Sequence, residues 1–484
     1  MSAPSNPPAS ALLAVCLLGG CAVGPDFHRP AAPAATHFTQ GTDPEGSRSA
    51  AGTAQHFQPG ASVPRDWWQL FHSAALDAAI DEALARDPGL EAAQASLRQS
   101  QDNLRSGYGI FYPAVEAQAA ATRERFSGLQ IGQMGAGRVF NLFTLSASVN
   151  YALDVFGGQR RLVEGLHAQV DVADATATGT YLTLATNIAN TVIARAAYQA
   201  EADATRELIE LQRSQVHLAE VQAEAGTVPY STVLSLRSQL ASFEASIPRL
   251  EQQIAQSDDL LSALAGHTPA EWTAPPVKLS ELTLPAELPV SVPSALVRQR
   301  PDILAAEAVA HAASAQVGVA TAAMLPSVNL SGAVSTSSNQ ASGLFAGEGR
   351  GWSINGTASV PLFEGGTLWY KRRAAVAGYQ QASALYRQTV LAAFEQVADV
   401  LNALEHDAEA LEAQQESLDS ARQALRLVHA NYQAGLATYL DELNADAQYH
   451  EAQIAVLEAT ALRYQDTVAL FAALGGGWWN RRSP

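Results

Sequence analysis

Four stretches of the chain alternate apolar and polar side chains with a period of two, which is the pattern of a β-strand with two different faces. They span residues 113–126, 141–156, 326–336 and 352–362. Each is long enough to cross a membrane as a tilted strand, which takes about 9–11 residues. In the clearest one, odd positions are apolar and even positions are uncharged and polar: Phe143, Leu145, Ala147, Val149, Tyr151 and Leu153 against Thr144, Ser146, Ser148 and Asn150.

A lone strand of this kind fits a soluble sandwich, since one of its faces also packs against a core. Four matched strands with Gly- and Ser-rich loops favour a transmembrane barrel whose apolar face meets lipid. Four strands cannot close a barrel around a lumen, because about eight is the practical minimum. An open sheet edge would leave backbone N–H and C=O groups unpaired in lipid. The pattern therefore predicts that several chains share one barrel.

Two much longer segments carry an apolar stripe in steps of four and three residues, and no proline interrupts 158–226 or 366–435. A helix of about 70 residues rises about 100 Å, and a sustained heptad predicts a left-handed coiled coil. Gly226 and Gly435 stand where each helix must reverse, since glycine supplies the positive φ of a helix stop. We expect long hairpins at about 158–265 and 366–474. Their predicted seams include Val233, Leu236, Leu240, Phe243, Ile247, Leu250 and Ile254, then Val390, Phe394, Val397, Leu401, Leu404, Ala408, Leu411, Gln415 and Leu418, and finally Leu440, Leu443, Ala447, His450, Ile454, Leu457, Ala461, Tyr464, Val468 and Phe471.

These elements occur twice, about 210 residues apart. The motif Ala225-Gly226-Thr227-Val228-Pro229-Tyr230 recurs as Ala434-Gly435-Leu436-Ala437-Thr438-Tyr439, and Phe156-Gly157-Gly158 recurs as Phe363-Glu364-Gly365-Gly366. We therefore expect an internal tandem duplication with two structural repeats, 65–280 and 281–476. Each repeat holds two strands and one long hairpin, and a short tail follows at 477–484. A helix is also expected from Trp67 to Asp87.

The N-terminus reads as a processing signal. Residues 1–20 contain a short apolar stretch that ends in Leu18-Gly19-Gly20, directly before Cys21. Small residues before a cysteine are what a lipoprotein signal peptidase accepts, so we expect lipid on Cys21, although the usual basic residues at the start are missing. Ala22 favours the outer membrane. Residues 21–64 are rich in Ala, Pro, Gly, Ser and Thr, and predict an extended lipidated tether.

Charge and motif content argue against most other functions. Charged residues make up 16% of the 484 residues, and the net charge of −18 argues against nucleic acid. Loss of the signal would leave one cysteine, so neither a disulfide nor a cysteine metal site is expected. We find no phosphate loop, hydrolase motif or His/Cys cluster, and expect no enzyme activity, metal or cofactor beyond the lipid on Cys21. His450 is expected in the packed core, and the acids Glu405, Asp407, Glu409 and Glu412 on a solvated face.

Several motifs together resemble one family. They are Trp67-Trp68 with Leu70-Phe71, Asp87-Pro88-Gly89-Leu90, Arg300-Pro301-Asp302-Ile303-Leu304-Ala305-Ala306-Glu307 and Val360-Pro361-Leu362-Phe363-Glu364-Gly365-Gly366. In this order they resemble the TolC-like outer-membrane efflux factors. The segment from Cys21 to Phe27 with Arg29-Pro30 is similar to the lipoprotein branch, the NodT-type subunits that serve RND pumps.

The resemblance implies an α+β membrane channel, built as a homotrimer. Three chains would share a 12-stranded transmembrane β-barrel that continues into a periplasmic α-helical coiled-coil barrel. It also implies a periplasmic adaptor and an inner-membrane RND-type transporter as partners, with this chain as the passive exit duct for small molecules. A channel for type I protein secretion is an alternative, and so is a periplasmic coiled-coil tether without a pore. The exported substrate cannot be read from the sequence.

Adaptor contact and channel closure fall on the hairpin tips in this family. The resemblance implies docking at Gly226, Thr227, Tyr230, Gly435, Leu436 and Tyr439. Some relatives close the aperture with an acidic and a basic residue, but the corresponding positions here hold Asn444 and Ala447. We therefore expect polar and aromatic contacts of Tyr432 and Asn444 to close it. Asp441 and Asp446 either form a ring that attracts cations or simply face solvent.

Overall fold

The computed structural model describes residues 22–50, 53–126 and 138–480. Within them the chain forms two compact units. Residues 22–29, 97–173 and 306–386 make up the first, called the strand unit below. The second, called the hairpin unit, comprises residues 30–96, 174–305 and 387–480.

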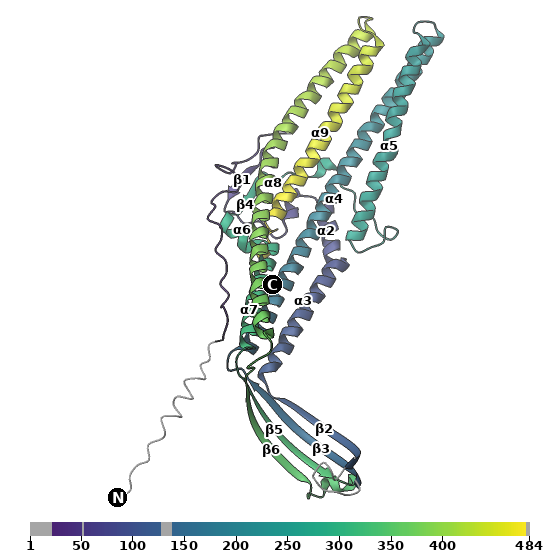
Figure 1. Ribbon diagram of the computed structural model, residues 1–484. Helices are drawn as coiled ribbons and strands as arrows, with labels where there is room; N and C mark the ends of the chain where they lie inside the picture. Colours follow the sequence, from purple (N-terminus) through teal and green to yellow (C-terminus); the bar gives the residue numbers. More distant parts are fainter. Residues whose placement is uncertain (1–21, 51–52, 127–137, 481–484) are drawn as a thin grey trace. The chain divides into compact units, whose positions relative to one another are not determined.

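The strand unit contains a four-stranded antiparallel sheet in the order β2-β3-β5-β6 (Figure 1). Its two outer strands, β2 and β6, each pair with one neighbour in the described sheet, so each presents one free edge. The strands are β2 (Ala114–Phe126), β3 (Arg138–Leu153), β5 (Ser327–Ser338) and β6 (Arg350–Ser359).

The register of this sheet places apolar residues on one face and polar residues on the other. Paired residues share a face, and one row across the four strands reads Val115, Val149, Gly332 and Ile354. A second row on the same face reads Ala117, Ala147, Val334 and Trp352, whereas the opposite face carries Gln118, Ser146, Ser335 and Gly351 in one row. The apolar face is therefore continuous across the sheet, as the alternating pattern predicted.

Two strands end earlier than the alternation predicted. β3 stops at Leu153 rather than at 156, because the carboxylate of Asp154 accepts hydrogen bonds from the backbone N–H groups of Gln159 and Arg160. Those bonds cap the start of a helix, so the chain must leave the sheet first. β6 stops at Ser359 rather than at 362, since Pro361 has no N–H to give to a neighbouring strand.

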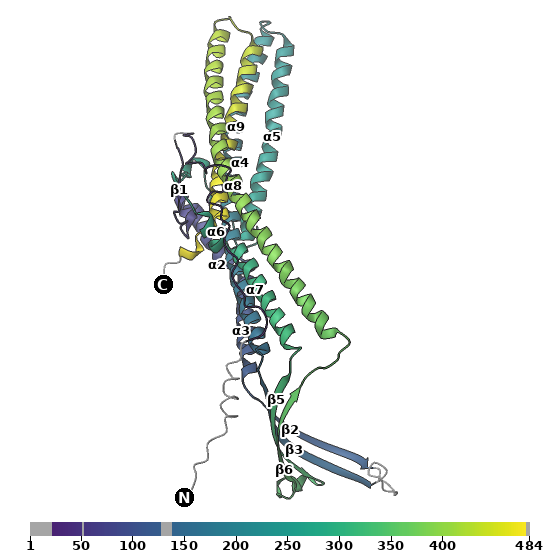
Figure 2. The ribbon, with the colours of Figure 1, turned by 60° about the vertical axis from the view of Figure 1, so that its left-hand side comes forward.

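The two long hairpins have matching lengths. Helices α4 (Gly158–Glu224) and α8 (Thr367–Gln433) have 67 residues each, and the returning helices α5 (Tyr230–Leu264) and α9 (Tyr439–Ala473) have 35 each. The distal parts of these helices lie side by side in the hairpin unit, with both turns at the same end (Figure 2). The equal lengths show that the sequence repeat is also a structural repeat.

Of the 26 predicted seam positions, 14 are buried, 11 are partly buried and one is exposed. Leu401, Leu404 and Leu411 of α8 are each 1% exposed or less. Leu440, at the start of α9, is 62% exposed. Beside it Glu442 is 4% exposed, so the buried face of α9 is turned by part of a helical turn relative to the prediction. The first turns of α9 bury polar side chains, which an apolar pattern cannot detect.

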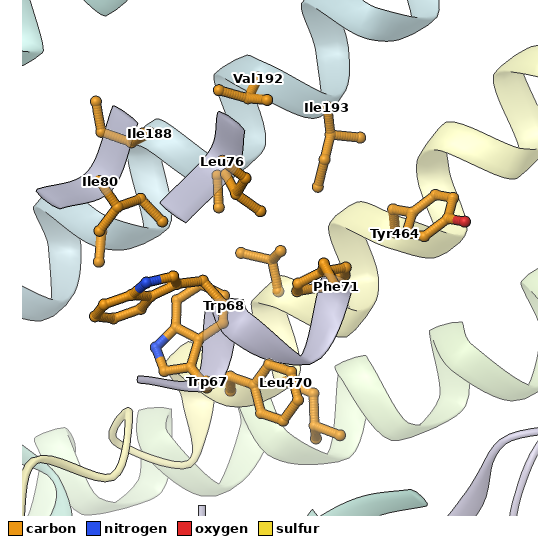
Figure 3. Packing of buried hydrophobic residues seen from close by; sticks show 14 of the residues in the cluster. Trp67, Trp68, Phe71, Leu76, Ile80, Ile188, Val192, Ile193, Tyr464 and Leu470 are labelled. Carbon is orange, nitrogen blue, oxygen red and sulfur yellow. The ribbon is translucent and has the colours of Figure 1, made fainter. Parts of the chain in front are cut away.

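The aromatic motif near the N-terminus forms the core of the hairpin unit (Figure 3). Trp67 and Trp68 are almost fully buried in the 3₁₀ helix η1 (Trp67–Phe71), and Trp67 packs on Phe471 of α9 at 5.4 Å between ring centroids. The predicted helix from 67 to 87 is wrong at its start. His72 adopts a left-handed φ of 52°, and Ser73 then caps helix α2 (Ala74–Arg86).

Parts of residues 22–64, which were predicted as an extended tether, pack against the folded chain. In the strand unit, Phe27 stacks on His311 at 4.5 Å between ring centroids. In the hairpin unit, the buried guanidinium of Arg463 donates to the backbone oxygens of Ala50 and Thr53. Strand β1 (His56–Pro59) then pairs in parallel with β4 (Glu287–Val290). Residues 22–64 are called the strap below, because several of them are in contact with the rest of the chain.

The remaining helices are α3 (Pro88–Gly107), α6 (Pro293–Gln299) and α7 (Pro301–Ala322). By length and composition alone, α7 is apolar enough to cross a membrane. Its small residues instead pack closely on α4, since a Cβ built on Gly158 would lie 2.9 Å from the Cβ of Ala322. Short 3₁₀ helices cover Tyr108–Phe111 (η2), Leu279–Glu281 (η4), Ala341–Phe345 (η5) and Trp478–Asn480 (η6).

Candidate functional site

The turn of each hairpin uses the same backbone motif. Gly226 and Gly435 adopt φ values of 73° and 71°, in the left-handed region that favours glycine. The N–H of Thr227 donates to the oxygen of Gln222, and that of Leu436 donates to the oxygen of Asn431. These bonds satisfy the carbonyls that a helix end leaves free. A Cβ on either glycine would meet no atom within 4 Å, so the requirement for glycine is conformational rather than steric.

The predicted docking residues differ in how free their side chains are. Tyr230 is 59% exposed and Leu436 is 80% exposed, and Thr227 is also exposed. Tyr439 is only half-buried as a residue, but its hydroxyl donates to Oε1 of Gln215 at 3.1 Å. The side chains of Tyr230 and Leu436 are therefore accessible to a partner, whereas the Tyr439 hydroxyl is hydrogen-bonded within the chain.

Gln215 joins the two hairpins near their turns. Its Nε2 donates to Oδ2 of Asp446 at 2.9 Å, while its Oε1 accepts from Tyr439. Asp446 is 2% exposed, so the prediction that it simply faces solvent is wrong, and the ring of acids stays a prediction. Burial raises the pKa of Asp446, and the hydrogen bond from Gln215 opposes that shift.

A second buried acid lies one helical turn away. Glu442 is 4% exposed, and its Oε1 lies 2.6 Å from Nδ1 of His429 on α8. The other ring nitrogen of His429 lies 2.8 Å from the side-chain nitrogen of Gln433. Gln215, His429, Glu442 and Asp446, together with Tyr439, are called the tip network below. It links α4, α8 and α9, and its two acids, Glu442 and Asp446, are buried, whereas His429 is exposed.

The other predicted aperture residues have separate surroundings. Asp441 accepts from the N–H and hydroxyl of Thr438 in a capping box, and these hydrogen bonds lower its pKa. The Tyr432 ring meets Tyr439 edge-on, at 5.7 Å between centroids, and Asn444 is exposed. Within one chain Tyr432 therefore has an aromatic neighbour, and the seal by Tyr432 and Asn444 stays a prediction.

Sequence reasoning missed Gln215, His429 and Glu442. Spacing could have shown only Glu442, since 439, 442, 446 and 450 follow one another in steps of three and four residues along α9, whereas Gln215 and His429 lie on other helices. His450 lies on this line and is buried as predicted, edge-on to Phe243, and burial lowers its pKa. The acids expected on a solvated face are only partly so. Glu412 is exposed, whereas Asp407 interacts with Asp466 and helps burial to raise the pKa of Asp466 to about 8.

The segment that follows the predicted lipid site is held firmly in the strand unit. Cys21 itself lies outside the described residues. Two residues later, the N–H of Val23 donates to the oxygen of Phe156 at 3.0 Å. Arg161 is 4% exposed and binds Asp26 at 2.6 Å while also donating to the oxygen of Val23. A lipid on Cys21 would thus be attached close to the end of β3.

The sequence matches a known protein family over most of its length. The family model described as outer membrane efflux protein matches residues 79–267 and 292–476. The chain belongs to this family. These two segments fall one in each repeat, so the efflux protein carries the family pattern in both halves.

Individual relatives of this efflux protein share its full length. The toluene efflux pump outer membrane protein TtgC of Pseudomonas putida is 28% identical over 466 residues, which cover 96% of this chain and 94% of the relative. The outer membrane protein OprJ of Pseudomonas aeruginosa is 29% identical, covering 98% and 96%. The solved structure of the outer-membrane channel OprN has a TM-score of 0.86 and 26% identity, and covers 95% of this chain and all of that one.

These likenesses place the efflux protein in the outer membrane and make it the exit duct of an efflux system. The family is one of channels rather than of enzymes. Among residues 22–50, 53–126 and 138–480, no group of three or more His, Cys, Asp or Glu side chains is placed to hold a metal ion.

Proposed function

We propose that three copies of the chain close a single 12-stranded barrel in the outer membrane, which continues into a helical duct in the periplasm. The observation that carries this proposal is the four-stranded sheet with one continuous apolar face and free edges on β2 and β6. In lipid those edges need partners, and pairing β6 of one copy with β2 of the next satisfies both. Three copies give twelve strands, enough to enclose a lumen.

The test is the mass of the purified protein in detergent, measured by native mass spectrometry after mild crosslinking. The expected result is one species of three chains that conducts ions in planar bilayers. A stable monomer with the same conductance would refute the shared barrel, and a two- or four-chain species would refute the number.

We further propose that the duct receives small molecules from an inner-membrane RND-type pump through a periplasmic adaptor that docks on the exposed turns. The names of relatives such as the toluene pump protein support small molecules over secreted proteins. Exposed Tyr230 and Leu436 at the turns support docking there. Co-purification with an adaptor and pump encoded beside this chain tests the partners. Loss of protein secretion, with normal drug resistance, in a deletion strain would favour type I secretion instead.

We also propose that Cys21 carries the lipid. The Leu18-Gly19-Gly20-Cys21 site supports this, and so does the tight attachment of the next residues near the end of β3. The lipid then enters the membrane where the sheet does, and no long spacer is needed between them.

A further inference from the structure

Helix α8 begins at Thr367, after β6 has ended at Ser359, and its first two turns contain two aromatic and three basic residues in a row. These residues, Trp369, Tyr370, Lys371, Arg372 and Arg373, are called the basic-aromatic cluster below. They belong to the strand unit together with β6. Trp369 is 48% exposed and Tyr370 is 62% exposed, and the three basic residues are exposed too. The run includes one of only two lysines in the chain.

The cluster is held in place rather than free to move. Gly365 and Gly366 adopt φ values of 61° and 85°, and the N–H of Tyr370 donates to the oxygen of Gly366 at 3.0 Å. The Trp369 and Tyr370 rings meet edge-on, at 4.9 Å between centroids. The Arg373 guanidinium lies over the Trp369 ring at 4.7 Å, which is a cation–π contact. The aromatic rings and the Arg373 guanidinium therefore lie next to one another at the start of α8.

The three cations have no carboxylate within ion-pair distance among the residues that the structure describes. Arg372 donates only to the hydroxyl of Thr321, at 3.2 Å. Lys371, Arg372 and Arg373 are the fifth to seventh residues of α8, beyond the first turn, where the helix dipole has little effect on a charge. The run is thus not explained by the stability of α8 alone.

In the first repeat, the basic residues at the start of the corresponding helix, α4, form ion pairs within the chain. At the start of α4, Arg160 binds Asp154, and Arg161 binds Asp26 and Glu164. Both arginines are neutralised within the chain. Since the two repeats share their fold, the unpaired cations of α8 mark a difference in what the two helix starts contact.

Charge is also distributed unevenly between the two units. The strand unit has 12 Lys or Arg and 10 Asp or Glu, a net charge of +2. The chain as a whole carries −18, and residues 30–480 of the hairpin unit carry −22, since Arg481 and Arg482 follow that range. A strongly acidic protein therefore has its only net basic part next to the membrane-crossing sheet. Such a part is attracted to an anionic surface.

We propose that the basic-aromatic cluster binds the phosphate of an anionic phospholipid at the periplasmic surface of the outer membrane. Trp and Tyr side chains favour the boundary between lipid and water, and barrels carry aromatic girdles there. The guanidinium groups of Arg372 and Arg373 suit phosphate oxygens, and Lys371 adds a third charge. The proposal rests on the membrane-crossing role proposed for the sheet, since β6 ends at Ser359, ten positions before Trp369.

The test is lipid retention by the purified, delipidated oligomer, counted by native mass spectrometry after addition of phosphatidylglycerol or phosphatidylcholine. The wild type should retain phosphatidylglycerol at a concentration at least tenfold lower than phosphatidylcholine, and less of it at high salt. Changing Lys371, Arg372 and Arg373 together to Gln should abolish that preference. Interchanging Lys and Arg at the three positions keeps the charge and should retain most of it.

A matched control changes Arg206, Arg213 and Arg237 to Gln. These exposed, ion-paired residues belong to the hairpin unit and give the same change in net charge. This variant should keep the lipid preference.

Three results would overturn the proposal. The first is equal retention of the two lipids by the wild type. The second is that inorganic phosphate at millimolar concentration prevents the binding of phosphatidylglycerol, which would make the site one for free phosphate. The third is failure of the triple Gln variant to assemble while the control assembles, which would assign the cluster to contact between copies. A wild-type oligomer of the wrong mass instead refutes the shared barrel and leaves lipid retention to be scored separately.

Discussion

Changing Gln215 to Ala removes the amide that joins the two hairpins of one chain. Asp446 is 2% exposed, and its carboxylate accepts a hydrogen bond from the Gln215 side chain at 2.9 Å. The variant leaves a buried carboxylate without that donor. A hydrogen bond to a charged group contributes about 1.5–3 kcal/mol, and an unsatisfied buried acceptor costs a similar amount. We therefore expect local opening of the first turns of α9 to become easier by about 2 kcal/mol.

Changing Asp446 to Asn should not make local opening of α9 easier. The amide oxygen still accepts from Gln215, and the cost of burying a charge disappears. In this background, loss of the Gln215 amide should cost only about 1 kcal/mol, as for a neutral hydrogen bond. The difference between the two backgrounds measures the coupling between these side chains.

The dependence on pH follows from the direction of the pKa shift. Burial raises the pKa of Asp446, so the folded state binds this proton more tightly than the unfolded state does. Stability of the tip network should therefore fall as pH rises from the unfolded pKa, about 3.9, through the folded value. The Asp446→Asn variant should lack this component of the pH dependence.

Hydrogen–deuterium exchange of the purified oligomer measures this opening in a peptide that spans residues 439–450. Gln215→Ala should speed exchange by about 10- to 100-fold, since about 1.4 kcal/mol corresponds to a factor of ten. Gln448 is exposed on the same helix, and Gln448→Ala serves as the control. If Gln215→Ala exchanges like the control, or if Asp446→Asn loosens the turn as much, the buried hydrogen bond does not hold the hairpins together.

Three further predictions concern the turns, the anchor and the aperture. Gly226→Val and Gly435→Val should each strain their turn by about 1 kcal/mol or more and give drug sensitivity with normal assembly; normal efflux by both would exclude the turns as the adaptor contact. Mass spectrometry of the mature protein should find diacylated Cys21 at its N-terminus, and an intact signal would contradict that. Changing Tyr432 and Asn444 together to Ala should raise single-channel conductance across a range of salt, whereas wild-type conductance would exclude them from the seal.

Periodicity was sufficient for the repeating elements and failed where side chains fit specific partners. The alternation from 141 onward predicted the two faces of β3, but not its end, because that end depends on the Asp154 carboxylate accepting from the next helix. The prediction of an extended tether at residues 21–64 did not foresee the contacts of the strap, for a similar reason. A composition rich in Ala and Pro carries no period, and its order comes from contacts such as that of Arg463 with Ala50, 413 residues apart.

The candidate site was only partly predictable. The turns were visible because glycine at Gly226 and Gly435 reports a backbone requirement that is local in sequence. The tip network was not, because its partners come from three helices. Gln215 and Asp446 are 231 residues apart, and an acid on a surface-like helix gives no sign that it is buried.

The two copies of the hairpin differ in the charged side chains that join their helices. Four arginine–carboxylate pairs bridge α4 and α5, involving Arg195, Arg206, Arg213 and Arg237. Between α8 and α9 the described residues show one ion pair, between His429 and Glu442. Dissolved salt screens exposed ion pairs. Although both hairpins descend from one duplicated segment, a change in ionic strength should therefore act more on the first than on the second.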